Sequence, residues 1–190
     1  MAAWDFVKKL SDADKFELSV INPGLITGPH IVKATFPTAD ITKAVMTGGM
    51  PMIQHSVPII NVEDCALAHL RAMTSPEAAG KRFILAERVI WFKDLCDWHH
   101  NKFGADGFNK IPRKPMQLGC FIKMLACCVH DIKILCQEWD KHYSVDTSNT
   151  MSILGFEKDG GLKNCEEETL KMTELLVKEG YIVRDADAKK

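Results

Sequence analysis

The sequence lacks a surplus of charge of either sign. Its 190 residues contain 24 Lys and Arg against 25 Asp and Glu, a formal net charge of −1. Nucleic-acid-binding proteins usually carry a basic excess, so the composition predicts no nucleic-acid partner. Hydrophobic residues make up 46% and charged residues 26%, which excludes disordered and fibrous classes and predicts one globular domain over residues 1–190.

A hydrophobic run long enough to cross a membrane is also missing. The longest stretch without a formal charge covers residues 44–62, but Gly48, Gly49, Pro51 and Pro58 interrupt it. Proline removes a backbone donor and breaks a helix, so this stretch is excluded as a membrane-spanning segment. We therefore expect no membrane association.

Signals of secretion are absent too. The seven cysteines are odd in number and irregularly spaced, and none of the six asparagines begins an Asn-x-Ser/Thr sequence. Asp5, Lys8 and Lys9 stand where a signal peptide would need an apolar core. These features predict reduced thiols and a cytoplasmic location.

The hydrophobic pattern predicts a helix-rich α/β protein with few strands. Residues 15–22 alternate between polar and apolar and then become apolar, which is typical of a strand buried in a sheet. This segment is the one strand expected at the centre of a sheet. A second strand is expected over 57–62 and a third over 81–85. The helix that follows the second strand has a packing face of small residues. The expected helices are 1–10, 40–46, 63–73, 91–103, 116–139, 146–154 and 166–178.

Five segments in register carry a resemblance to a known family. They are AAWDFV at 2–7, FELSVINPGLITGP at 16–29, VPIINVEDCALAHLRAM at 57–73, PEAAGKRFIL at 76–85 and DTSNTMSILGF at 146–156. In order and spacing they resemble the C-terminal half of the extended short-chain dehydrogenase/reductases. The branch they resemble contains dihydroflavonol, cinnamoyl-CoA and ketone/aldehyde reductases.

This resemblance implies an α/β fold that is the C-terminal portion of a Rossmann-type reductase. One or two remnant strands of a parallel sheet would remain, and residues 24–58 and 104–145 would build a small substrate-binding lobe. The implied chemistry is NAD- or NADP-dependent oxidation and reduction of a CH–OH/C=O pair, with a small carbonyl compound or alcohol as substrate.

Two motifs of the family are missing from the sequence. No G-x-G-x-x-G or G-x-x-G-x-x-G pattern occurs, although such a turn holds the cofactor pyrophosphate. The family's Tyr-x-x-x-Lys is missing as well, because Tyr143 is followed by Thr147 and Tyr181 by Asp185 at the lysine position. We therefore expect a truncated reductase without catalytic residues. A non-catalytic binding or regulatory partner of a full-length reductase is the alternative, and the exposed edge of strand 16–22 would permit self-association.

The cofactor-binding candidates follow the buried strand. Pro23 fixes φ and Gly24 permits a close backbone approach, at the strand end where open α/β sheets place ligands. From the residues alone, an ordinary strand-to-loop turn fits equally well. The resemblance favours cofactor contacts at Pro23, Gly24 and Leu25, and it adds Thr38 as a small hydroxyl residue.

Substrate contacts are expected from the apolar residues 116–125. Runs of Met, Phe and Leu form adaptable apolar walls, and relatives build the lid over the substrate here. Met116 and Phe121 are the candidates. Burial in an ordinary hydrophobic core explains the same pattern.

Other polar residues are expected to have structural roles. Asp64 opens a predicted helix, where a carboxylate meets free backbone N–H groups. His69 on the same helix is predicted to be packed or exposed to solvent. Cys96 and His100 lie one helical turn apart beside His99, but further ligands at suitable spacing are missing, so no metal site is expected.

Overall fold

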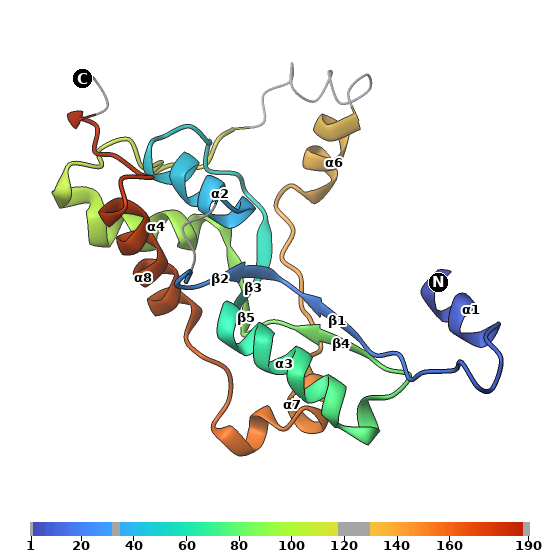
Figure 1. Ribbon diagram of the computed structural model, residues 1–190. Helices are drawn as coiled ribbons and strands as arrows, with labels where there is room; N and C mark the ends of the chain where they lie inside the picture. The colour runs from blue at the N-terminus through green and yellow to red at the C-terminus, as the bar shows by residue number, and fades with distance from the viewer. Residues whose placement is uncertain (1, 32–34, 118–129, 188–190) are drawn as a thin grey trace.

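The structure, a computed structural model, describes residues 2–31, 35–117 and 130–187 (Figure 1). Its helices and strands alternate along most of the chain, and three short 3-10 helices occur at Pro76–Ala78, Gly104–Asp106 and Phe156–Asp159. The elements are α1 (Ala2–Lys8), β1 (Val20–Pro23), β2 (Leu25–Thr27), α2 (Pro37–Met46), β3 (Ser56–Asn61), α3 (Val62–Thr74), β4 (Arg82–Leu85), β5 (Arg88–Trp91), α4 (Phe92–Phe103), α6 (His130–Glu138), α7 (Ser148–Ile153) and α8 (Cys165–Lys178).

The strands form two small sheets. β1 pairs with β4 in parallel, whereas β2 pairs in parallel with β3, and β3 pairs in antiparallel with β5. The chain crosses from the first sheet to the second at Gly24, the single residue between β1 and β2. The amide of Gly24 still donates to the carbonyl of Leu85 over 2.9 Å, so this residue completes the first ladder before the chain turns away.

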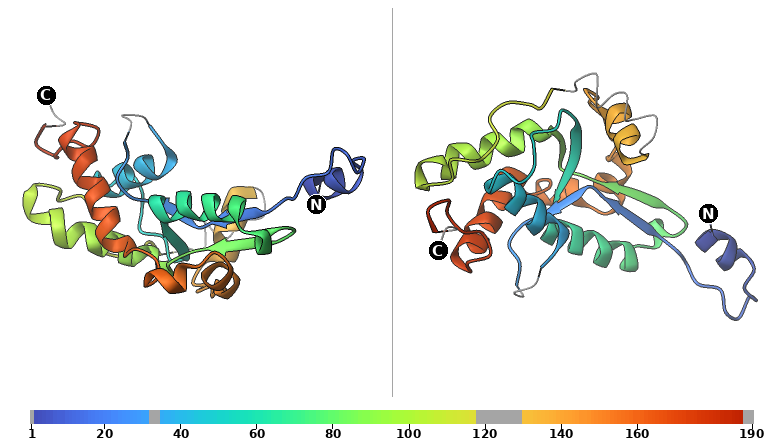
Figure 2. Two further views of the ribbon diagram at one scale, coloured as in Figure 1. Left: turned by 60° about the horizontal axis from the view of Figure 1, so that its bottom comes forward. Right: turned by 90° about the horizontal axis from the view of Figure 1, so that it is seen from above.

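Helices cover both sheets. α3 and α7 lie on opposite faces of the β1–β4 pair (Figure 2), and the Thr150 hydroxyl on α7 donates to the carbonyl of Ile84 over 2.6 Å. α2, α4 and α8 gather around the second sheet, while α1 stands apart at the end of an extended segment (Figure 1). None of the helices in the described ranges is long and apolar enough to span a membrane.

Two hydrophobic clusters form the core, and β3 contributes to both. Ile59 belongs to the cluster between the second sheet and helices α2, α4 and α8. Ile60 belongs to the cluster that joins α3 and β4 to α7. Successive side chains of a strand point to opposite faces, so one strand supplies both clusters.

Most of the expected elements are confirmed. The helices predicted over 1–10, 63–73, 91–103, 146–154 and 166–178 are present, and each end lies within two residues of its predicted position. The α/β class and the parallel pairing are confirmed as well.

The number and length of the strands were predicted wrongly. The described residues form five strands, against three strands expected from the pattern and one or two expected from the family resemblance, and the strand expected over 15–22 begins only at Val20. β2 and β5 were missed, because three or four residues are too few to show a pattern. β5 adds an antiparallel pair with β3 beside the expected parallel pairing.

Two helices differ from expectation. The helix expected over 40–46 begins at Pro37, since proline at the first position needs no hydrogen-bond partner for its nitrogen. The helix expected over 116–139 is observed over His130–Glu138, and Met116 and Gln117 are not helical. Residues 118–129 lie outside the described residues.

Candidate functional site

A cavity of ≈ 740 Å³ opens where β1 ends and β2 begins. Its wall is mainly apolar and combines the 24–31 segment with the start of α2, the first turns of α3 and one residue of α8. The volume is typical of sites for small molecules. The lining residues are Gly24, Leu25, Ile26, Thr27, Gly28, Pro29, His30, Ile31, Phe36, Pro37, Thr38, Val62, Glu63, Ala66 and Met172.

Three of the four cofactor-binding candidates meet in this cavity. Gly24, Leu25 and Thr38 line it, although Thr38 lies 13 residues beyond Leu25 in the chain. The Thr38 hydroxyl donates to the carbonyl of Ile26 over 2.7 Å and so holds the start of α2 against β2. Pro23 is exposed and does not line the cavity.

Gly24 is required by its surroundings. A Cβ at this position would lie 2.4 Å from the carbonyl oxygen and 2.6 Å from the carbonyl carbon of Pro58 on β3. Backbone atoms of a paired strand have little room to move. The glycine therefore permits the crossing between the two sheets, and it also lines the cavity.

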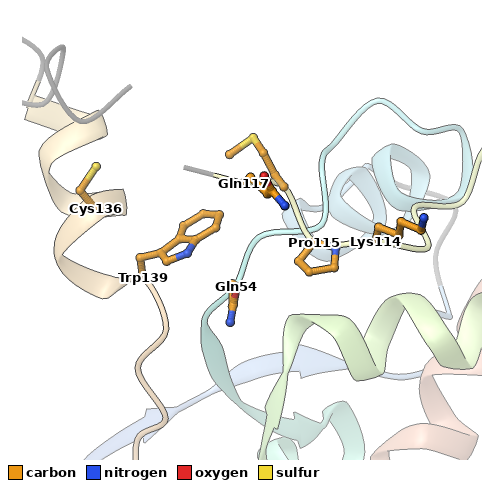
Figure 3. A pocket seen from close by; sticks show the side chains of 7 residues that line it. Gln54, Lys114, Pro115, Gln117, Cys136 and Trp139 are labelled. Carbon is orange, nitrogen blue, oxygen red and sulfur yellow. The ribbon is translucent and has the colours of Figure 1, made fainter. Parts of the chain in front are cut away.

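The substrate candidate Met116 lies in a different cavity. This one measures ≈ 760 Å³ and is also lined by Gln54, Lys114, Pro115, Gln117, Cys136 and Trp139. Trp139 projects from the end of α6 toward Gln54 and Gln117 (Figure 3). The other candidate, Phe121, lies outside the described residues. Met116 and the cofactor candidates line different cavities.

Asp64 ties the start of α3 to the segment before α8. Its Oδ2 accepts a hydrogen bond from the Lys163 amide over 2.7 Å, and burial raises the pKa of this carboxyl. The helix cap itself is Asn61, whose side chain accepts from the amides of Glu63 and Asp64. Asn61 was missed, although an asparagine just before a predicted helix is a recognised start signal.

His99 and Cys96 of α4 are buried, whereas His100 is half-buried. Burial lowers the pKa of His99 to about 4 and raises the pKa of Cys96 to about 12. The His99 ring donates from Nδ1 to the Leu95 carbonyl over 2.7 Å, and its Nε2 lies 2.9 Å from the Thr173 hydroxyl oxygen. No group of three or more potential metal ligands was found within residues 2–31, 35–117 and 130–187. His69 is exposed, with Nδ1 bonded to the Cys65 carbonyl.

His30 is a residue of the cavity that the sequence analysis missed. Its Nε2 lies 2.9 Å from a carboxylate oxygen of Glu179, at the end of α8. Its ring packs at 56° to the ring of Phe36, with centroids 5.5 Å apart. The partners are 149 positions apart in the chain, so no local pattern could indicate the pair.

Parallel strands covered by helices, with a ligand-sized cavity at a strand end, define the Rossmann-type class of α/β proteins. Comparison with known proteins narrows this class. No family model matches the chain, but several individual proteins do.

Most of the relatives by sequence are oxidoreductases. An uncharacterized oxidoreductase of Saccharomyces cerevisiae, YDR541C, is 31% identical over 82% of this chain and 42% of its own. The NADPH-dependent methylglyoxal reductase GRE2 of the same yeast is 29% identical over 50% of this chain and 30% of its own. Cinnamoyl-CoA reductase CAD2 of Medicago truncatula is 30% identical over 50% of this chain and 27% of its own.

Solved structures share the fold over nearly the whole chain. Yeast Gre2 complexed with NADPH aligns with a TM-score of 0.68 and 23% identity, over 94% of this chain and 53% of that protein. A nucleoside-diphosphate-sugar epimerase of Pseudomonas aeruginosa aligns with a TM-score of 0.66 and 16% identity, over 95% and 55%.

The fold and the relatives together support the extended short-chain dehydrogenase/reductases as the family of this chain. The chain spans about half the length of the proteins it matches. The resemblance stated from the sequence motifs is thereby confirmed.

Proposed function

We propose that this chain forms the part of an NAD(P)-dependent reductase that surrounds the nicotinamide ring and the substrate. The observation that carries the proposal is the cavity that Gly24, Leu25 and Thr38 line together. When bound, the cofactor would exchange a hydride with a small carbonyl compound or alcohol. The relatives named as methylglyoxal and cinnamoyl-CoA reductases support this substrate class. Pro23 would contribute at the rim.

The residues present suit the nicotinamide end of a dinucleotide better than its phosphates. Gly24 and Leu25 supply close backbone and apolar contacts, and the Thr38 oxygen keeps a lone pair because its proton is donated to Ile26. The sequence contains no Gly-rich turn for the pyrophosphate. We assign the substrate lobe to residues 24–58 and 104–145, which would include Met116 and Phe121.

Neither tyrosine has the surroundings of a catalytic acid. Tyr181 donates its hydroxyl proton to Asp40, and this hydrogen bond raises the pKa of the phenol. Catalysis by such a group needs a lowered pKa. Tyr143 is exposed and bonds through its backbone amide to Ser56. We therefore propose that these 190 residues alone catalyse no turnover and bind dinucleotide weakly.

A titration of the purified chain tests this function. NADPH and NADH would be added with fluorescence detection, beside a turnover assay over a panel of aldehydes and ketones. We expect no saturation at micromolar cofactor and no turnover, because a missing positioned acid alone costs a factor of about 10²–10⁴. Micromolar binding, or turnover that survives Tyr143→Phe and Tyr181→Phe, would contradict the proposed incompetence.

A second candidate is a non-catalytic binding or regulatory partner of a full-length reductase, or a self-associating chain. The observation in its favour is β1, which pairs with β4 but with no other strand in the described part of the chain. An unpaired edge can accept a further strand. Sequencing the transcript upstream of Met1 separates the candidates, since an in-frame Gly-rich turn followed by Tyr-x-x-x-Lys would favour the reductase.

The four cysteines within the described residues, Cys65, Cys96, Cys136 and Cys165, are free thiols. Free thiols are typical of a reducing compartment. We accordingly place the proposed activity in the cytoplasm.

A further inference from the structure

The far edge of β1 is available for pairing with a further strand. β1 pairs with β4, and no other strand of the described residues lies along its far edge (Figure 2). The amides of Val20 and Gly24 donate toward the β4 side, so Ile21 directs its N–H and its carbonyl outward. Edge strands are commonly protected by charged side chains, but no residue from 18 to 29 is charged.

A second exposed feature is an apolar stripe on helix α3. Its members are Val62, Ala66, Leu70 and Met73. They follow one another at three or four positions, so they lie on one side of the helix. All four are exposed, and the exposed fraction rises from 36% at Val62 to 83% at Met73. His69 and Glu63 border this α3 stripe on its two sides.

The α3 stripe lies on the side of the helix that is nearer to the open edge of β1. On the opposite flank of α3, Arg71 forms an ion pair with Asp159, in the segment that follows α7. Because α7 is hydrogen-bonded to β4, that flank belongs to the β4 side of the sheet. Val62 and Ala66 instead line the cavity together with residues 24–31, which continue β1.

The edge and the stripe together fit a second copy of the chain related by a two-fold axis. Two β1 strands in antiparallel would pair Ile21 with Ile21 of the other copy, since a residue that directs both groups outward is complementary to itself. The strand order becomes β4–β1–β1–β4. Each α3 covers one β1–β4 pair, so the two helices lie two strand spacings apart, about 9.6 Å. Helices in contact are about 8–10 Å apart, which brings the two stripes together.

We propose that this chain forms a two-fold symmetric dimer in which the β1 edges pair and the two α3 stripes pack against each other. The proposal rests on self-association, the second candidate function, and adds the helix face that takes part. The two helices run antiparallel, so the positive N-terminal end of each lies near the negative C-terminal end of the other. This places the partner's Met73 beside Val62, at the wall of the cavity beside Gly24.

Sedimentation velocity over a range of protein concentrations measures the dimer. We expect a monomer–dimer equilibrium for the wild type. Met73→Glu should raise the dissociation constant about tenfold or more, because each copy would bury a carboxylate against apolar side chains. Met73 is exposed in the single chain, so the variant should fold, and circular dichroism checks that it does.

Val183→Glu is the matched control for the charge. Val183 is a 41% exposed apolar residue beyond the end of α8, away from β1 and α3. The substitution adds the same negative charge to the chain outside the proposed interface. It should change the dissociation constant by less than about twofold.

NMR on a mixed dimer tests the arrangement of the helices. Copies with ¹³C-labelled methionine methyl groups are mixed with copies that carry labelled valine methyl groups. We expect a nuclear Overhauser effect between Met73 of one copy and Val62 of the other. Within one copy these residues are separated by about 16 Å along the helix, too far for such a signal.

The outcomes separate the two parts of the interface. A wild type that stays monomeric at every concentration overturns the whole proposal, without bearing on the cofactor titration that tests the reductase function. A dimer that Met73→Glu and Val183→Glu weaken equally, or one without the Met73–Val62 signal, overturns the role of α3 and leaves pairing through β1 alone.

Discussion

Gly24 is the residue whose substitution should have the clearest local effect. Alanine there would place a Cβ 2.4 Å from the Pro58 carbonyl oxygen, which belongs to backbone held by the pairing of β3 with β5. Overpacking of this kind typically costs about 1–3 kcal/mol. We expect Gly24→Ala to reach the upper part of that range, about 3 kcal/mol, as measured by urea unfolding with circular dichroism.

Gly49 provides the matched control for this prediction. A Cβ there would meet its nearest neighbour, the Thr47 hydroxyl oxygen, at 3.6 Å, an ordinary contact. Gly49→Ala should change the free energy of unfolding by less than about 0.5 kcal/mol. Equal effects of the two substitutions would show that contact with Pro58 is not the cause.

At the residue scale, sequence reasoning located part of the cavity wall. The strand-end rule led to Gly24 and Leu25, because a ligand site at the end of a parallel strand follows from local order. It failed for His30, whose partner Glu179 is brought near only when α8 packs beside β2. Met116, predicted to contact the substrate, lines a separate cavity, and its contact with the substrate stays a prediction.

His99 links two helices and should make the stability depend on pH. Its ring on α4 bonds to Thr173 on α8, and burial lowers its pKa from 6.5 to about 4. The unfolded chain therefore binds a proton at higher pH than the folded chain does. The stabilisation from the neutral ring is complete above pH 6.5 and is lost progressively as the pH falls toward 4.

The size of this effect follows from the two pKa values. Between pH 7 and pH 4.5 the contribution of His99 to the free energy of unfolding should fall by about 2–3 kcal/mol. Urea unfolding at a series of pH values, for the wild type and for His99→Gln, measures it. Glutamine can keep a hydrogen bond to Thr173 but does not titrate in this range, so its profile should be flatter. Parallel profiles would refute the assignment.

At the scale of elements, length decided what the sequence could predict. α4 and α8 carry 12 and 14 residues, enough for the helical period to repeat several times. β2 and β5 carry three and four residues and owe their conformation to pairing with β3. Such strands are defined by a partner that is distant in the chain, and a local pattern does not contain that information.

At the scale of the whole molecule, Pro23 bears on the proposed association through β1. Val20 and Gly24 donate their amides to the carbonyls of Lys81, just before β4, and Leu85 on β4, so the even-numbered positions face β4 and Pro23 faces the open edge. Proline has no N–H, which removes one donor from that edge without weakening the pair. The edge is thus partly blocked.

Restoring the donor should strengthen self-association. We expect Pro23→Val to lower the dissociation constant between copies by about tenfold, because valine restores one backbone N–H that can donate to a strand of the second copy. Sedimentation velocity over a range of protein concentrations measures this. Pro23→Val and the wild type sedimenting alike at every concentration would argue against association through this edge.

The shared strand β3 has a consequence for how the molecule melts. Because adjacent residues Ile59 and Ile60 belong to different hydrophobic clusters, neither cluster can disperse while β3 stays in place for the other. A boundary between independently melting units would have to run through a single peptide bond. The two clusters therefore form one cooperative unit, in which loosening of either side is transmitted to the other through β3.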